Sequence, residues 1–192
     1  PLTSSNAGLP GERNGIAIGS EPIITALQSF QTNCCIHSSR YGQAIAARAI
    51  ASGALASISE TVIRPHYQQK FTVVETTLNQ YLPQDIPWFL HRGEGAIFAW
   101  LWLDELPITD WEFYQQLKEV GIIVVPGNSF FPGLREDWQH TKQCFRISLT
   151  ATNDEIALGM QRLAKVAQTV YQSRGVAPVR SDLTVTALIC YP

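Results

Sequence analysis

One stretch of the sequence carries residues whose types and spacing could do chemistry by themselves, a glycine-containing turn. It reads Gly8-Leu9-Pro10-Gly11-Glu12-Arg13. Such a turn lets backbone N–H groups approach an anion, and an arginine can bind phosphate through two donors of its planar guanidinium. Taken alone, a loop with a solvated arginine is the simpler interpretation.

Arg146 alternates with Phe145 and Ile147 in a segment otherwise suited to burial. A charged side chain there needs a partner, because burying an unpaired charge costs much free energy. A bound carboxylate held by two parallel hydrogen bonds is one such partner. An internal salt bridge with Asp or Glu is the other, and both interpretations stay open.

The cysteines and histidines show no metal-binding spacing. Cys34 and Cys35 are adjacent, Cys144 and Cys190 stand apart, and no C-x-x-C or H-E-x-x-H motif occurs. We expect reduced thiols, no metal site and histidines with structural or surface roles. The role of His140 is left open.

Composition limits the possible partners. The chain has 192 residues, a formal net charge of −2 and scattered basic residues, so nucleic-acid binding has little support. A long apolar run, Ala96–Leu103, is too short to cross a bilayer. We expect a cytoplasmic globular protein that binds neither nucleic acid nor a membrane.

The first half of the chain is predicted to be mainly helical. A loop over 1–15 leads to a short strand at 15–19 and to helices near 22–31 and 43–52. Ser57-x-x-Glu60 has the form of a capping box that opens a longer helix with one apolar face, which ends before Pro83. Pro65 should kink that helix or move its start.

Beyond Pro83 the pattern changes to a mixture of strands and helices. Strands are predicted at Ala96–Leu103, Gly121–Val125 and Phe145–Leu149, and helices at Trp111–Glu119 and Asp154–Ser173. This order describes an α+β domain with helices packed on a single sheet. Residues 176–192 fit neither pattern and are predicted to be a tail.

Several motifs together resemble the fold-type-I aminotransferases, which depend on pyridoxal phosphate. Their Ser-x-Ser-Lys segment, with the turn and arginine that follow it, is similar to a stretch of this chain near its start. That stretch reads Thr3-Ser4-Ser5-Asn6-Ala7-Gly8-Leu9-Pro10-Gly11-Glu12-Arg13-Asn14-Gly15. Glu94-Gly95-Ala96-Ile97-Phe98 resembles the first strand of their small domain. Val124–Gly133 resembles their substrate-facing turn, and Trp138–Arg146 the approach to their substrate arginine. The Phe-Phe-Pro-Gly turn and the Trp-x-His-Thr-x-Gln-Cys-x-Arg stretch favour the valine–pyruvate branch.

The resemblance implies the fold class α+β / α/β, as the C-terminal portion of a fold-type-I aminotransferase. Residues 1–55 would be a remnant of the large cofactor-binding domain. Residues 56–84 would be the long connecting helix, 85–175 the small α+β domain and 176–192 a tail.

The resemblance also implies roles for particular residues. Arg13, with Thr3 and Ser5, would contact the phosphate of pyridoxal 5'-phosphate, and Arg146 would bind the substrate α-carboxylate. Ser129, Phe130 and His140 would line the substrate site, and packing within their loops explains these three residues equally well. The substrates would be an amino acid and a 2-oxo acid, and a homodimer is possible.

One departure from the family pattern concerns position 6, where the family has the lysine that holds the cofactor as a Schiff base. This chain has Asn6, and an amide can neither form the imine nor act as a base at neutral pH. Ser5-Asn6-Ala7 also resembles the residues left behind when a purification tag is cut off. Two explanations of Asn6 therefore stay open, a native substitution of the lysine and a remnant of a tag. We expect no activity from this chain alone, and a non-catalytic binding or dimerisation module is the alternative.

Overall fold

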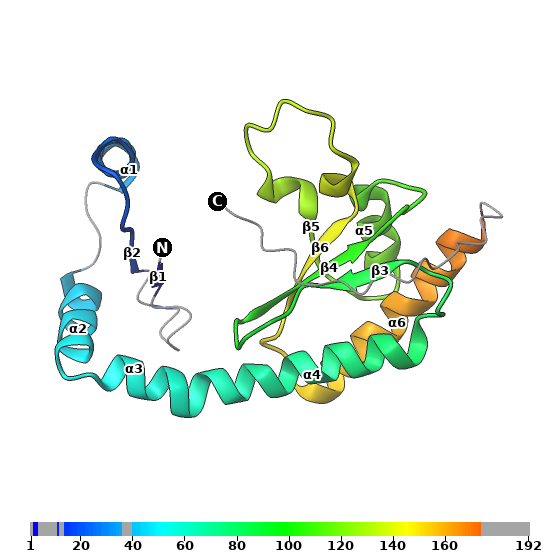
Figure 1. Ribbon diagram of the computed structural model, residues 1–192, viewed down its shortest axis with the longest axis horizontal. Helices are drawn as coiled ribbons and strands as arrows, with labels where there is room; N and C mark the ends of the chain where they lie inside the picture. The colour runs from blue at the N-terminus through cyan, green and yellow to red at the C-terminus, as the bar shows by residue number, and fades with distance from the viewer. Residues whose placement is uncertain (1, 4–10, 12–13, 36–39, 174–192) are drawn as a thin grey trace. The chain divides into compact units, whose positions relative to one another are not determined.

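The computed structural model describes residues 2–3, 11, 14–35 and 40–173, and the chain divides into two compact units, Pro1–His66 and Tyr67–Pro192 (Figure 1). The division lies within the predicted connecting helix, 56–84. The predicted boundaries after residues 55 and 84 stay predictions, and the predicted tail, 176–192, lies outside the described residues.

The first unit begins with a small hairpin and the helices that follow it, and it also includes the start of a longer helical run. Strand β1 (Leu2–Thr3) pairs antiparallel with β2 (Gly15–Ile16), with Thr3 opposite Gly15. Helices α1 (Glu21–Cys35) and α2 (Arg40–Ala51) follow, and each is longer than predicted at one end or both. The predicted strand over 15–19 is shorter in the structure, because pairing stops at Ile16.

Three helical segments succeed one another without a break. They are α3 (Ala54–Ile58), the π-helical η3 (Ser59–Ile63) and α4 (Arg64–Tyr81). The predicted capping box at Ser57 is wrong: α3 starts after Gly53, whose φ of 74° breaks the preceding helix, and no side chain caps it.

The predicted disturbance at Pro65 takes the form of a π turn. The Arg64 N–H donates to the carbonyl of Ser59, five residues earlier. Proline lacks an N–H and its ring crowds the carbonyl one turn before it, so a wider turn accommodates Pro65 without ending the helix.

The second unit is built on a four-stranded antiparallel sheet with the strand order β3-β4-β6-β5. Its strands are β3 (Trp88–Leu90), β4 (Phe98–Leu103), β5 (Val125–Pro126) and β6 (Cys144–Ser148). The three predicted strands therefore lie in one sheet, as expected. The short strand β3 had no clear alternation in sequence and was missed.

Strand β5 begins later than predicted because the residues before it end a helix. Helix α5 (Asp110–Glu119) is followed by Gly121 at φ 77°. The Ile122 N–H donates to the Leu117 carbonyl at 2.9 Å, and the Gly121 N–H to the Lys118 carbonyl at 3.0 Å. This pair of bonds is a Schellman motif, which uses residues 121–122 to close the helix.

One face of the sheet carries the hydrophobic core. Alternate strand residues such as Leu101 and Phe145 are fully buried, as are Phe113 of α5 and Leu163 of α6 (Asn153–Gln172). The C-terminal part of α4 adds Val74 and Leu78 to the same core cluster. The predicted packing of the last helix on the sheet is thus confirmed (Figure 1).

The opposite face carries the other alternate residues of β4 and β6. The segment joining β5 to β6 includes two 3-10 turns, η4 (Gly127–Phe130) and η5 (Gln139–Lys142). Rings from this segment contact rings of β4. No helix in the described ranges is both long enough and apolar enough to span a membrane.

Candidate functional site

Arg146 lies on the sheet face away from the core. It pairs with Trp100 of β4 and Val125 of β5, and it sits between the buried residues Phe145 and Ile147, which point the other way. Its side chain is half-buried. A strand that buries one face therefore places this arginine on the other, as the period of two requires.

Two aromatic rings contact the guanidinium of Arg146. Its central carbon lies 4.1 Å from the ring centroid of Phe98 and 4.9 Å from that of Phe130. Across the described ranges, the ion pair found joins Lys142 to Asp137, and no carboxylate pairs with Arg146. The internal salt bridge considered from the sequence is therefore absent from the described residues.

The rings around Arg146 belong to a larger cluster, which we call the aromatic face. Successive rings contact one another from Trp100 through Phe131 and Trp138 to His140 and Trp102, with centroid separations of 4.6–6.2 Å. The aromatic face consists of Phe89, Phe98, Trp100, Trp102, Phe130, Phe131, Trp138 and His140. Arg146 is the charged side chain seated on these rings.

The turn that brings Phe130 to Arg146 is held at two points. A Cβ on Gly127 would lie 2.6 Å from the carbonyl oxygen of Cys144, so only glycine allows this close approach to β6. The next residue, Asn128, donates its N–H to Oδ2 of Asp110 at 2.9 Å. Ser129 is exposed beside Phe130 on the same turn.

Asp110 was not singled out by the sequence. It is 3% exposed and is the first residue of α5. The sequence shows only that Asp110 is an acidic residue at the start of a predicted helix. Acidic residues are common there, so this position does not predict a hydrogen-bond partner on another segment.

His140 lies within the aromatic face, stacked on Trp138 at 4.6 Å, and its Nε2 is 3.4 Å from Sγ of Cys144. Burial lowers the pKa of His140 below its ordinary value, and the nearby Asp104 opposes this in part. Burial thus favours the neutral form of the imidazole. Its contacts are those of a packing residue.

The candidates for cofactor contact can be placed only in part. The backbone of Thr3 is paired in the β1–β2 hairpin. Ser5, Asn6 and Arg13, together with the side chain of Thr3, lie outside the described residues.

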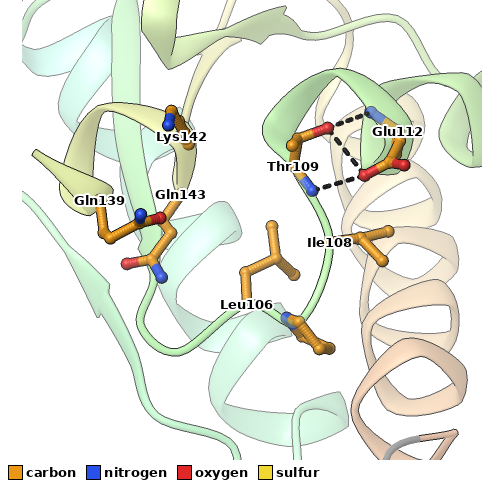
Figure 2. Close-up of a pocket in the computed structure, with 8 residues that line it drawn as sticks. Leu106, Ile108, Thr109, Glu112, Gln139, Lys142 and Gln143 are labelled. Carbon is orange, nitrogen blue, oxygen red and sulfur yellow. Dashed lines mark hydrogen bonds between the residues drawn. The ribbon is translucent and has the colours of Figure 1, made fainter. Parts of the chain in front are cut away.

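An open pocket of about 330 Å³ lies elsewhere on the second unit. Figure 2 shows Thr109 and Glu112, which cap α5, on one side of it and Gln139, Lys142 and Gln143 on the other. Arg146 is not among its lining residues, so this hollow and the arginine are separate features. Over the described part of the chain, no three His, Cys, Asp or Glu side chains gather to hold a metal ion.

Comparison with known proteins identifies the family. Residues 3–163 match the model of the family described as aminotransferase class I and II. Over 164 residues the chain is 40% identical to valine–pyruvate aminotransferase of Escherichia coli K12. The matched region covers 85% of this chain and 39% of that protein.

Solved structures agree with the sequence match. Valine–pyruvate aminotransferase of Salmonella typhimurium LT2 superimposes with a TM-score of 0.72 and 38% identity, covering 86% of this chain and 42% of that one. An amino-acid aminotransferase of Psychrobacter arcticum, described as putative, has a TM-score of 0.72 and 35% identity, covering 86% and 38%.

The chain thus spans about two fifths of the length of these relatives. Their similarity confirms the predicted fold class and the resemblance seen in the motifs. The family model covers far more than half of the chain, and this chain therefore belongs to the aminotransferase class I and II family.

Proposed function

We propose that this chain is the C-terminal part of a pyridoxal-phosphate-dependent aminotransferase of the valine–pyruvate type, inactive by itself. The reaction would move an amino group between an aliphatic amino acid and a 2-oxo acid. The observation that carries the proposal is Arg146, a half-buried arginine without an ion-pair partner among the described residues, in a chain 40% identical to valine–pyruvate aminotransferase.

In this proposal Arg146 binds the α-carboxylate that every amino-acid and 2-oxo-acid substrate shares. A guanidinium offers two parallel donors to the two carboxylate oxygens. The rings of Phe98 and Phe130 lie over the Arg146 guanidinium and cover part of it, and where water is displaced a lower local dielectric strengthens the attraction between unlike charges. Ser129 and Phe130, on the neighbouring turn, line the same site.

The residues of this chain do not fit a covalently held cofactor, because position 6 is Asn. Pyridoxal phosphate, when bound in such enzymes, supplies an electron sink for carbanions. Arg13, Thr3 and Ser5 remain proposed phosphate contacts on the strength of the motif alone. A homodimer is likewise part of the proposal.

Asn6 also favours a second candidate, a non-catalytic binding or dimerisation module that keeps the aminotransferase fold. Restoring lysine separates the two. A chimera would join the upstream part of the E. coli enzyme to this chain carrying Asn6→Lys, and its transfer of an amino group from valine to pyruvate would be measured.

The same chimera tests Arg146. We expect Arg146→Lys to lower kcat/KM for every amino acid tested by about 10- to 100-fold, the value of one lost charge-assisted hydrogen bond. The matched control is Arg162→Lys, since Arg162 is an exposed arginine bonded to the Val120 carbonyl.

Each result has one meaning. Activity in the lysine chimera with a selective loss in Arg146→Lys supports the proposed function. Unchanged kinetics in Arg146→Lys would remove the carboxylate role. A folded chimera without activity would favour the non-catalytic module.

A further inference from the structure

The carboxylate of Asp110 has two backbone partners on different segments. Its Oδ1 accepts the Trp111 N–H at 3.0 Å, within its own helix. Its Oδ2 accepts the Asn128 N–H at 2.9 Å, from the turn η4 that follows β5. At 3% exposure the group is cut off from water, so these bonds replace its solvation.

Capping of α5 does not account for Asp110. Thr109 already caps this helix: its hydroxyl oxygen accepts the Glu112 N–H, and Glu112 in turn accepts the Thr109 N–H at 2.8 Å. A second acidic side chain at the helix start gains something from the helix dipole without being buried. Neither capping nor the helix dipole explains the bond to Asn128.

The turn held by Asp110 also carries a ring that touches Arg146. Two residues after Asn128 comes Phe130, whose ring lies 4.9 Å from the Arg146 guanidinium and 5.3 Å from the ring of Trp100, edge to face. Gly127, on the other side of Asn128, is pressed against the backbone of Cys144. The turn is therefore fixed to β6 by one contact and to α5 by the other.

We propose that Asp110 is a positioning residue for Arg146: it holds the turn Gly127–Phe130 so that the Phe130 ring stays on the guanidinium. The inference rests on the proposed function for what Arg146 binds, a substrate carboxylate. A guanidinium stacked on a held ring keeps one orientation, so less conformational entropy is lost when a carboxylate binds. Asp110 then acts on binding through Phe130 without touching the substrate.

The test uses the full 192-residue chain and the NMR signal of the Arg146 side-chain Nε–H. Aromatic rings shift a proton that lies over their faces upfield. Phe98 and Phe130 should therefore both move this resonance, and Phe130→Leu should remove the Phe130 part. We expect Asp110→Ala to bring the resonance to the position seen in Phe130→Leu.

The matched control is Asp154→Asn. Asp154 is an exposed acidic residue in the first turn of α6, so this variant removes the same charge from a helix start without touching the turn. Asp110→Asn is the second variant: its amide replaces one of the two carboxylate oxygens by an NH2 donor, which faces an N–H group and cannot accept its hydrogen bond. If Asp110→Ala does not fold, Asp110→Asn alone tests the positioning role of Asp110.

A shift toward the Phe130→Leu position in either Asp110 variant, with none in Asp154→Asn, supports the positioning role. A lower urea midpoint with the Arg146 resonance unmoved would show that Asp110 only adds stability and would overturn the proposal. The readout needs no substrate, so an inactive chimera would reject the proposed function while the resonance still decides on Asp110.

Discussion

Arg146 and Asp110 show two ways in which a charged side chain is kept inside a small domain. Arg146 has no ion-pair partner among the described residues, and its guanidinium lies over ring faces, which attract a cation through their quadrupole. Both carboxylate oxygens of Asp110, by contrast, accept hydrogen bonds from backbone N–H groups. The first arrangement leaves capacity for a ligand, and the second joins two segments of the chain.

At the same scale, Asn6 makes a prediction about the cofactor. Incubation of the chain with pyridoxal phosphate, followed by borohydride reduction, should give no stoichiometric pyridoxyl adduct by intact mass, because an amide cannot form the imine. The Asn6→Lys chimera is the positive control. A single adduct that mapped to one of the lysines in the unchanged chain would refute the prediction.

The elements of the second unit are closed by strong local motifs. Helices α5 and α6 both begin with a capping box, Thr109 with Glu112 and Thr152 with Glu155. Helix α5 ends in a Schellman motif at Gly121. Such motifs satisfy the N–H and C=O groups that helix ends leave unpaired. They explain why these two helices were predictable from short sequence windows.

The cap of α6 gives a prediction at the element scale. Thr152→Ala should lower the free energy of unfolding of the second unit by about 1 kcal/mol, because an N-cap hydroxyl is lost. Thr169→Ala is the matched control: Thr169 is exposed within the same helix and bonds back to the Lys165 carbonyl. Alanine is the better helix former there, so this variant should be neutral or stabilising. Equal losses from both substitutions in urea unfolding would contradict the capping role.

The same cap should depend on pH. Hydrogen bonds from the backbone and side chain of Thr152 lower the pKa of Glu155 in the folded protein. A depressed carboxyl pKa contributes stability above the unfolded pKa, and that contribution is lost as the pH falls through the folded value. The difference in free energy of unfolding between the unchanged chain and Thr152→Ala should therefore become smaller in acid.

At the scale of the whole molecule, the two units differ in how much apolar surface they bury. Among the described residues up to His66, Gly42 alone is classed as buried. Helix α1 leaves Ile23, Leu27 and Phe30 between 47% and 68% exposed along one side. The second unit, by contrast, has an extensive buried core.

This difference predicts unequal stability along the chain. In hydrogen–deuterium exchange followed by mass spectrometry, backbone amides of α1 and α2 should exchange much faster than those of α6, since few buried contacts oppose local opening. In the chimera with the upstream part of the E. coli enzyme, α1 and α2 should become protected. Equal protection of α1 and α6 in the isolated chain would show that the first unit is stable without further burial.

The sequence alone determined the family and the main elements of the second unit. The motifs around Phe130 and Arg146, the apolar run of β4, the alternation in β6 and the periodicity of α6 are local patterns, and backbone geometry translates such patterns directly. The same locality produced the errors. Ser57 and Glu60 have the spacing of a capping box, yet Gly53 starts the helix earlier.

Only the tertiary structure decided which segments meet. The strand order β3-β4-β6-β5, the bond from Asp110 to Asn128 and the contact of Gly127 with Cys144 join residues far apart in the chain. No local preference encodes such pairs, because they form only when the sheet and its helices pack together. Arg146 illustrates this difference. Its strand could be predicted from the alternation of the sequence. The two rings that contact its guanidinium come from β4 and η4, and only packing brings them to it.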